Sequence, residues 1–379
     1  MKWHEKFLSF LMTVLFVLSL LVLIMIATNY ERNINEEIKV VNIKKLTTKK
    51  AETKELSMVM VGDCLIHRFV YSDALESDGS YNFDKMFTEV SPLILNHDLA
   101  YYNQESNIGG KQLGLSAYPR FNSPEEIGDT MTNMGFNLVS LANNHTMDRG
   151  EDGVINSVNY WKTKPGVYYS GEALSFEDRE SNIKVLEKNG IKYAFFSYTT
   201  VTNGLLPPLG KEYLTNVYEK DKALNDIEKV KDKVDLIIVA MHWGDEYTTN
   251  PNYNQKKVAT ELAEMGVNLV IGNHAHSIQP VEMINNTLVF YALGNFISAQ
   301  DTNDKQTGAL VTLNIKKEKN NIIFSDIKAN LIYTYFRYAS DFKVYPYSRI
   351  DDSILSNHDH YFNKYKSILN KYTDIIEVN

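Results

Sequence analysis

The sequence predicts an α/β domain that is preceded by one membrane-spanning helix. Short apolar runs, which are typical of buried strands, alternate with helical patterns from Ser57 to Phe296, and this alternation is characteristic of α/β proteins. A separate run of 21 residues without a charge, Phe7 to Ala27, would span roughly 30 Å as a helix, which is about the thickness of a bilayer core.

Composition excludes some classes of protein. The apolar and charged fractions, 44% and 23%, are those of a globular protein. The net charge is -8 and no basic block is present, so we expect no nucleic-acid partner. Cys64 is the only cysteine, so the chain can form no internal disulfide, and we expect its stability to come from the hydrophobic core.

Charges around the apolar run predict the topology. Lys2 and Lys6 precede the run and mostly acidic residues follow it, so the positive-inside bias keeps the amino terminus cytoplasmic. A cleaved signal peptide is the alternative, but the run is longer than a usual signal core and no small-x-small site follows it. We therefore expect a single-pass protein of the cytoplasmic membrane. Its segments would be a cytoplasmic end at 1–6, the anchor at 7–27 and a polar stalk at 28–55, with the rest outside.

The expected domain occupies residues 56–300, and residues 301–379 add short strands and a polar tail with helical character. The expected strands are 57–61, 98–103, 138–142, 167–169, 183–187, 193–197, 235–242, 268–271 and 288–293. The expected helices are 83–95, 123–134, 152–161 and one that Asn250-Pro251 caps. Ser123 as N-cap, Pro124 and Glu126 form the strongest start signal, and Gly135 is the stop signal.

Polar side chains follow five of the predicted strands, at the point where each strand ends. They are Asp63, Asn103 with Glu105, Asn144 with His145, His242, and His274 with His276. Ligands of α/β sheets bind at the carboxyl ends of strands, so we expect these groups to meet at one rim. Carboxylate, amide and imidazole groups without thiolate fit one or two divalent ions, Mn²⁺, Fe²⁺ or Zn²⁺. Each residue could instead be a cap or a core histidine, but their recurrence at strand ends favours a site.

Two local patterns refine the expected site. In extended backbone, residues two apart point to one side, so His274 and His276 would reach the same ion or two adjacent ions. Asn144 as a ligand, followed directly by His145 as a proton donor, suits metal-assisted hydrolysis.

The polar motifs recur in a characteristic order. They are Gly62-Asp63 with Arg68, Asn103-x-Glu105, Ala142-Asn-Asn-His-x-x-Asp148-x-Gly150, His242-Trp-Gly-x-Glu246-Tyr247, Gly272-x-His274-x-His276 with Gln279-Pro280 and Glu282, and Leu293-Gly-Asn-Phe296. From about Ser57 to Ser298 this series resembles the CapA-type capsule (poly-γ-glutamate) synthesis proteins, which are similar in fold to calcineurin-like metallophosphoesterases. The resemblance implies a four-layer α-β-β-α sandwich, a membrane anchor, and a role in making or exporting an anionic surface polymer.

The resemblance also assigns roles to residues. Metal ligands would be Asp63, Glu105, Asn144, His242, His274 and His276, and the catalytic imidazole would be His145. Candidate substrate-binding residues are Arg68, Asn103, Asn143 and Glu246. The chain departs from the phosphoesterases at two places. Their Asp-x-His opening is Asp63-Cys64-Leu65 here, so one histidine ligand is missing unless His67 folds back, and Glu105 replaces an Asp.

Three functions are compatible with these features. The first is a membrane-anchored metal-dependent hydrolase or transferase that acts on a phosphate ester or γ-glutamyl linkage during capsule synthesis. The second is a non-catalytic assembly or export subunit that binds the polymer, or its precursor, and other membrane subunits of a polymer synthase. The third is a secreted phosphoesterase unrelated to capsule, which the missing Asp-x-His disfavours.

Overall fold

The apolar run at the amino terminus lies within one uninterrupted helix, α1 (Lys2–Thr47), in this computed structural model. The structure describes residues 2–47 and 54–379. The helix is long and apolar enough to cross a membrane, and its apolar side chains at 7–26 are exposed, so a lipid environment would suit them. Residues 28–47 of the expected stalk continue this helix, and residues 48–53 lie outside the described residues. Helix α1 and the unit Lys54–Asn379 are separate compact units.

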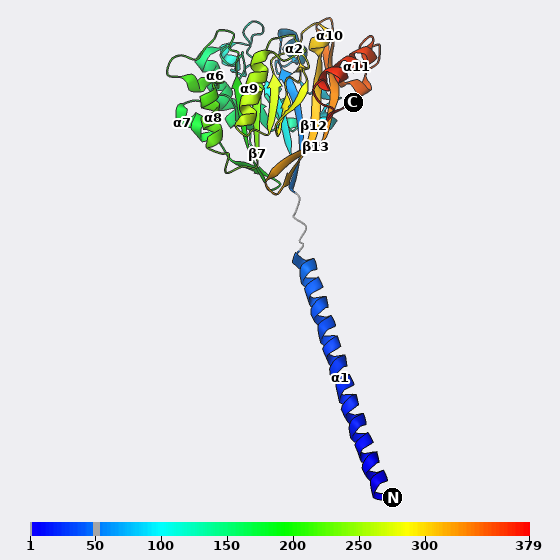
Figure 1. Ribbon diagram of the computed structural model, residues 1–379. Helices are drawn as coiled ribbons and strands as arrows, with labels where there is room; N and C mark the ends of the chain where they lie inside the picture. The colour runs from blue at the N-terminus through cyan, green and yellow to red at the C-terminus, as the bar shows by residue number, and fades with distance from the viewer. Residues whose placement is uncertain (1, 48–53) are drawn as a thin grey trace. The chain divides into compact units, whose positions relative to one another are not determined.

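Two mixed sheets form the framework of the domain (Figure 1). The first has the order β14-β13-β12-β1-β2-β3-β4, and the second has the order β5-β6-β7-β8-β10-β9. The first sheet contains β1 (Lys54–Cys64), β2 (Leu99–Gln104), β3 (Leu138–Ser140), β4 (Tyr168–Ser170), β11 (Asn295–Ile297), β12 (Thr307–Glu318), β13 (Asn321–Arg337), β14 (Ser340–Pro346) and β15 (Glu377–Val378). The second contains β5 (Leu186–Lys188), β6 (Ile191–Thr199), β7 (Leu236–His242), β8 (Leu269–Asn273), β9 (Val281–Ile284) and β10 (Thr287–Phe290).

The helices of the domain pack on the sheets, and the last of them contributes Tyr365 and Leu369 to the core between the sheets. These helices are α2 (Arg68–Ala74), α3 (Asp84–Phe87), α4 (Ser91–Ile94), α5 (Glu126–Asn133), α6 (Gly150–Lys162), α7 (Phe176–Ser181), α8 (Lys220–Glu228), α9 (Tyr253–Glu264), α10 (Asn303–Gln306) and α11 (His358–Leu369). Apolar residues of α5 and α6 pack on the outer face of the first sheet. Those of α8 and α9 pack on the outer face of the second sheet (Figure 1).

A third core lies between the sheets and joins them. Met58 and Tyr101 of the first sheet share this buried cluster with Phe195 and Ile238 of the second. Polar contacts cross the same interface, since the hydroxyls of Ser140 and Ser197 lie 2.8 Å apart. The layers therefore run helix, sheet, sheet, helix, which confirms the predicted α/β class and its four-layer arrangement.

Parallel pairing brings many strand ends to common edges. Strands β1, β2, β3 and β4 are mutually parallel along the first sheet. Strands β6, β7, β8 and β10 are parallel along the second. Polar residues that follow these strands are thus placed at carboxyl ends, where α/β sheets bind ligands.

Several local predictions were wrong in detail. Helix α5 begins at Glu126 without a side-chain cap, because the Ser123 hydroxyl instead donates to Ser106. Helix α9 is capped by Asn252, two residues after the predicted Asn250, in a capping box with Gln255. The helix expected at 83–95 is two short helices, α3 and α4.

The carboxyl-terminal region also differs from its expected short strands. It contains a long antiparallel meander, β12 to β14, which extends the first sheet. The polar tail forms α11 and then β15, which pairs with β13. The apolar pattern also did not predict the short strands β9 and β11.

A buried acid outside the strand-end cluster predicts a pH effect on stability. Burial raises the pKa of Glu172 from 4.5 to about 8, although a hydrogen bond from Ser157 opposes the rise. Between these values the folded chain holds a proton that the unfolded chain has lost, so stability falls as pH rises through this range. Glu172→Gln removes the titration. The melting temperature of this variant, relative to wild type, should therefore rise progressively between about pH 5 and pH 8.

Calorimetric scans of both proteins across this range would measure the difference. The exposed Glu76→Gln is the control, and its profile should run parallel to wild type. A parallel profile for Glu172→Gln as well would mean that the buried carboxyl does not retain its proton in the folded chain.

Candidate metal centre

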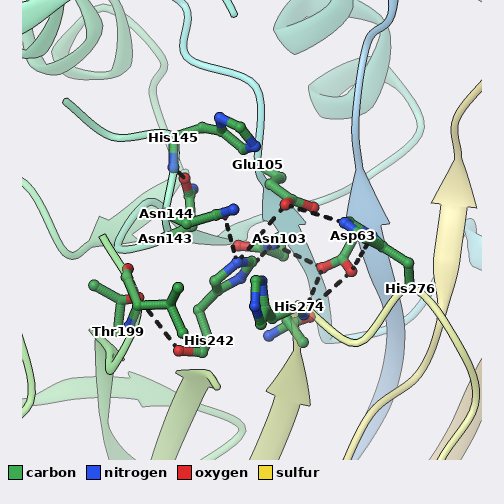
Figure 2. A network of polar contacts seen from close by, with 12 residues as sticks. Asp63, Asn103, Glu105, Asn143, Asn144, His145, Thr199, His242, His274 and His276 are labelled. Carbon is green, nitrogen blue, oxygen red and sulfur yellow. Dashed lines mark hydrogen bonds and ion pairs between the residues drawn. The ribbon is translucent and has the colours of Figure 1, made fainter. Parts of the chain in front are cut away.

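Strand ends from both sheets meet in one buried polar cluster (Figure 2). From the first sheet come Asp63, at the end of β1, and Glu105, which follows β2. From the second come His242, at the end of β7, and the pair His274 and His276 after β8. Each of these side chains is at most 4% exposed. The predicted convergence of strand ends therefore occurs, but at the edges of two facing sheets.

Two glycines allow the backbones to approach at this point. A Cβ on Gly62, just before Asp63, would lie 1.8 Å from the carbonyl oxygen of Gly294. A Cβ on Gly272, two residues before His274, would lie 1.9 Å from the carbonyl oxygen of Tyr291. No side chain fits at such distances, so glycine is required where the acid and the histidine are placed.

The cluster contains two candidate ligand groups that share one residue. The first is Glu105 with His242 and His274, and the second is Glu105 with Asp63 and His276. Glu105 Oε1 lies 3.7 Å from His242 Nε2 and 3.6 Å from His276 Nε2. Metal–ligand bonds of roughly 2.0–2.2 Å place neighbouring ligand atoms about 3–4 Å apart. A carboxylate between two such groups is suited to bridging two ions.

Unpartnered buried atoms support this assignment. Both carboxylate oxygens of Glu105 and the Nδ1 atom of His274 are buried without a hydrogen-bond partner among the described residues. Leaving buried polar groups unpaired is costly, particularly for a carboxylate. The residues present therefore fit a bound cation, and these histidine, glutamate and aspartate groups could hold divalent metal ions.

Burial and charge act together on the cluster. Burial raises the pKa of the Glu105 carboxyl well above its ordinary value of 4.5, and the nearby Asp63 adds to the rise. Burial opposes a charge on His276, but Glu105 and Asp63 outweigh that effect and raise its pKa to about 10. Burial lowers the pKa of His274 to about 4 and that of His242 well below 6.5. The carboxylates thus require positive charge, and two imidazoles are neutral, which is the form that binds metal.

Asn144 and Asn103 surround His242. The Asn144 Oδ1 atom lies 2.8 Å from His242 Nε2, close enough for both to bind one ion. Asn103 Nδ2 donates to Asp63 Oδ1 at 2.8 Å and lies 3.3 Å from His242 Nδ1. Asn103, predicted to bind substrate, therefore connects ligands from the two sheets and orients them.

His145 lies at the edge of the cluster (Figure 2). A carboxylate holds its imidazole. Its Nδ1 atom is 2.7 Å from Asp148 Oδ2, which also accepts the backbone N–H of Phe121 at 2.6 Å. The Phe121 ring packs edge-on against the imidazole at 4.6 Å between centroids. An ionised carboxylate only accepts hydrogen bonds, so Nδ1 carries the hydrogen and Nε2 is left for other partners.

The predicted geometry of the His274 and His276 pair was wrong. Both residues have positive φ, 88° and 50°, in the turn after β8, so they are not in extended backbone. Their rings still lie 6.2 Å apart between centroids. Convergence therefore comes from a strained turn, which is common at functional sites, and not from strand alternation.

The remaining predicted residues lie in different surroundings. Arg68 is exposed at the start of α2. Asn143 accepts the N–H of His145 and donates to the carbonyls of Gln104 and Leu141, so it shapes the loop. Glu246 is exposed after β7, where its charge acts on His274 and His276. Substrate binding by these residues stays a prediction.

His67 was the residue that could replace the histidine ligand missing from the Asp-x-His opening. Its Nδ1 lies 3.1 Å from the carbonyl oxygen of Leu65 and 3.2 Å from the N–H of Ala299. It belongs to neither candidate ligand group in the described part of the chain, so His67 does not fold back to replace the absent histidine.

Two residues near the cluster had no predicted role. Asn295 Oδ1 lies 2.9 Å from His276 Nδ1 and orients that ring. Tyr247 packs over the same imidazole at 5.9 Å between centroids and adopts a positive φ of 63°. Asn295 follows an apolar run, the signal that identified the other ligands, and could have been included on that basis.

Comparisons with known proteins place the chain among capsule proteins. The family model described as "Bacterial capsule synthesis protein PGA_cap" matches residues 57–300. The PGA biosynthesis protein CapA of Bacillus subtilis (strain 168) is 28% identical over 276 residues, covering 69% of this chain and 68% of the relative. The Capsule biosynthesis protein CapA of Bacillus anthracis is 28% identical over 282 residues, covering 71% of this chain and 66% of the relative.

The chain also aligns with a solved structure. A candidate 5′-nucleotidase from Staphylococcus aureus, in complex with alpha-ketoglutarate, aligns with a TM-score of 0.46 and 14% identity. The alignment covers 81% of this chain and 58% of that one. That TM-score is too low to carry an inference about this chain.

The shared carboxylate predicts unequal effects of ligand mutations on metal content. Glu105→Gln should remove both ions from the full-length protein in detergent, because both ligand groups lose a charged oxygen. His274→Ala and His276→Ala should each reduce the content by about one ion. Elemental analysis after metal loading measures the content. Bound metal should also raise the melting temperature, since a ligand at 100 times its Kd stabilises by about 2.7 kcal/mol.

His97→Ala is the matched control, because this histidine precedes β2 at the opposite end of the strand. Its metal content should equal that of wild type. Wild-type metal content in Glu105→Gln would remove this carboxylate from the site.

Proposed function

The chain belongs to the bacterial capsule synthesis protein PGA_cap family, and from that premise we propose a function for its buried cluster. The protein is a membrane-anchored hydrolase or transferase that depends on one or two divalent ions, Mn²⁺, Fe²⁺ or Zn²⁺. It acts on a phosphate ester or a γ-glutamyl linkage during synthesis of a capsule polymer. Its substrate is the anionic polymer or a precursor of it.

The hydrogen-bonded pair of His145 and Asp148 beside the candidate metal ligands carries this proposal. A binding scaffold has no use for an imidazole oriented by a buried carboxylate next to a cation site. A hydrolase has such a use, because a positioned imidazole accepts or donates the proton of the reacting group. Asp148 fixes the tautomer in which Nε2 is available for this transfer.

Different residues of the site would bind the metal ions, orient the metal ligands and transfer the proton. Asp63, Glu105, Asn144, His242, His274 and His276 would hold the ions, which supply Lewis-acid polarisation of a phosphoryl or carbonyl oxygen when bound. Asn103 orients Asp63 and Asn295 orients His276, each by a hydrogen bond to the candidate ligand. His145 Nε2 accepts the proton of the attacking nucleophile and then donates it to the leaving group. The enclosed position of the ligands, which are nearly fully buried, strengthens each of these electrostatic interactions.

A second candidate function is a non-catalytic assembly or export subunit of a membrane polymer synthase. The absent histidine ligand, which His67 does not replace, is the observation that favours it. In that case the domain binds the polymer or neighbouring membrane subunits, and the imidazole has no essential chemistry. The third candidate, a phosphoesterase unrelated to capsule, is disfavoured by the family match.

The location of the domain is part of the proposal. Helix α1 is the membrane anchor, and Lys2 and Lys6 hold its amino end on the cytoplasmic side. The domain then lies outside the cytoplasmic membrane, where a surface polymer emerges. Its partners are the lipid bilayer and other membrane subunits of the synthase.

Substitution of the imidazole tests the catalytic proposal. General acid or base catalysis contributes about 10²–10⁴-fold in rate, so His145→Ala should reduce polymer output in cells nearly to background. Asp148→Asn should reduce it less, because the imidazole remains but its tautomer is no longer held. Polymer and anchored protein are measured in the same cells, and metal content is measured on the purified protein. Protein level and metal content should stay close to wild type.

His97→Ala again serves as the control for loss of a histidine. Normal polymer output from His145→Ala at a normal protein level would contradict the catalytic proposal and support the assembly subunit. A fall in protein level or metal content that matches the fall in polymer would indicate a structural role for His145.

Protease treatment of intact protoplasts tests the topology. Protease added outside should digest the domain, while a cytoplasmic marker protein stays intact. Full protection of the domain would place it in the cytoplasm and reverse the proposed orientation. A soluble product that begins near Asn29 would instead show that the anchor is cleaved.

A further inference from the structure

A cavity beside the imidazole is separate from the metal ligands. It has a volume of about 440 Å³ and is lined in part by Asp148, the partner of His145. Arg120 and Arg149 line the same cavity. The cavity is thus one residue away from the imidazole, because the lining residue Asp148 is hydrogen-bonded to His145.

The charges in this cavity are unbalanced. Neither of its two acids pairs with these arginines: Glu151 accepts hydrogen bonds from Lys211 at 2.5 and 2.7 Å, and the carboxylate of Asp148 is buried, with Oδ2 on His145 and Oδ1 without a partner among the described residues. Arg120 is exposed and forms no ion pair or side-chain hydrogen bond within residues 2–47 and 54–379. Arg149 donates only to the carbonyl oxygen of Leu113. Two guanidinium groups therefore face the cavity without an anion.

The local positive charge of the cavity contrasts with the negative net charge of the whole chain. Its net charge is -8, so a bound anion is repelled by the protein as a whole and needs local positive charge. Arg179 is paired with Asp226 and Arg349 with Glu89, whereas Arg120 and Arg149 are the two arginines that line one cavity and have no ion pair within the described ranges. Guanidinium groups match carboxylate and phosphate in shape and bind them with two parallel hydrogen bonds.

The opposite wall of the cavity is apolar. It comes from the loop at residues 204–210, which contributes Leu205, Leu206 and Pro208. Gly204 and Gly210 bound this loop with φ of 75° and 81°, a conformation that other residues rarely adopt. Leu206 is 67% exposed, so its side chain is accessible to a bound ligand.

We propose that this cavity is an anion-binding subsite that sets the specificity of the proposed reaction. Arg120 and Arg149 hold a carboxylate or phosphate group of the substrate, and the 204–210 loop covers the methylene groups next to it. The linkage to be cut then lies between the subsite and the metal ligands, within reach of His145. The subsite rests on the proposed function for its role in a reaction, but binding at the subsite can be measured without any reaction.

Binding measurements on the full-length protein in detergent test the subsite. The probe is a fluorescent γ-linked glutamate oligomer, followed by anisotropy, and inorganic phosphate is the competitor. Arg120→Gln and the double variant with Arg149→Gln should weaken binding of the anion that occupies the subsite. A weakening of about tenfold or more is expected from the double variant, which corresponds to 1.4 kcal/mol. Leu206→Ser should weaken binding of the oligomer and leave binding of phosphate unchanged.

Arg337→Gln is the matched control, because Arg337 is exposed, lies over the ring of Tyr338 and forms no ion pair in the described part of the chain. Its affinity should equal that of wild type. Competition by phosphate at the same residues would identify a phosphate-bearing substrate, and oligomer binding without competition would identify a carboxylate-bearing one. Either result supports the subsite.

Two results would overturn the subsite. One is binding by the arginine variants within about twofold of wild type, and the other is no binding of either anion by wild type. These outcomes are distinct from failure of the proposed function. Normal polymer output from His145→Ala would remove the chemistry while leaving anion binding to the arginines intact.

Discussion

Two buried carboxylates lie together in this structure, and neither carboxylate oxygen of one of them, Glu105, has a hydrogen-bond partner among the described residues. Asp63 and Glu105 lie side by side where the strand ends of both sheets meet. Negative charge in such surroundings is stable only with positive charge beside it. A proton on His276 can supply part of that charge, as its raised pKa shows, and divalent ions would supply more. Cationic partners are therefore required where the strand ends of both sheets meet.

The fold satisfies the requirement by bringing parallel strand ends from two sheets together. Asp63 pairs in register with Asn103 on one side and Asn295 on the other, so three polar residues share one edge. The Gly62 and Gly294 backbones approach too closely for any side chain. The apolar core between the sheets holds the opposing histidines at this edge. Packing of apolar residues thus fixes the distances between polar ones.

The hydrogen-bonded pair of His145 and Asp148 and the cavity lined by Arg120 and Arg149 lie beside the metal-ligand cluster and extend it into a larger candidate site. Phe121 connects them, because its backbone N–H holds Asp148 and its ring contacts His145. The segment that carries Phe121 also carries Arg120, which lines the cavity. One loop therefore positions both the proton-transferring group and the anion-binding group. Such coupling would let the binding of an anionic chain align its linkage with the imidazole.

Local sequence alone determined the long apolar helix, the α/β class and most residues of the buried polar cluster. A charge-free run of 21 residues is long enough to cross a membrane as a helix, and polar residues after buried strands lie at a sheet edge. Ser123 and Asn250 show the limit of local signals, since each lost its predicted capping role, Ser123 to a partner distant in sequence and Asn250 to a neighbouring residue. The pairing of the two sheets, the shared position of Glu105, the turn at His274 and the arginine cavity were decided by tertiary structure. They depend on contacts between residues far apart in the chain, which no periodicity or spacing records.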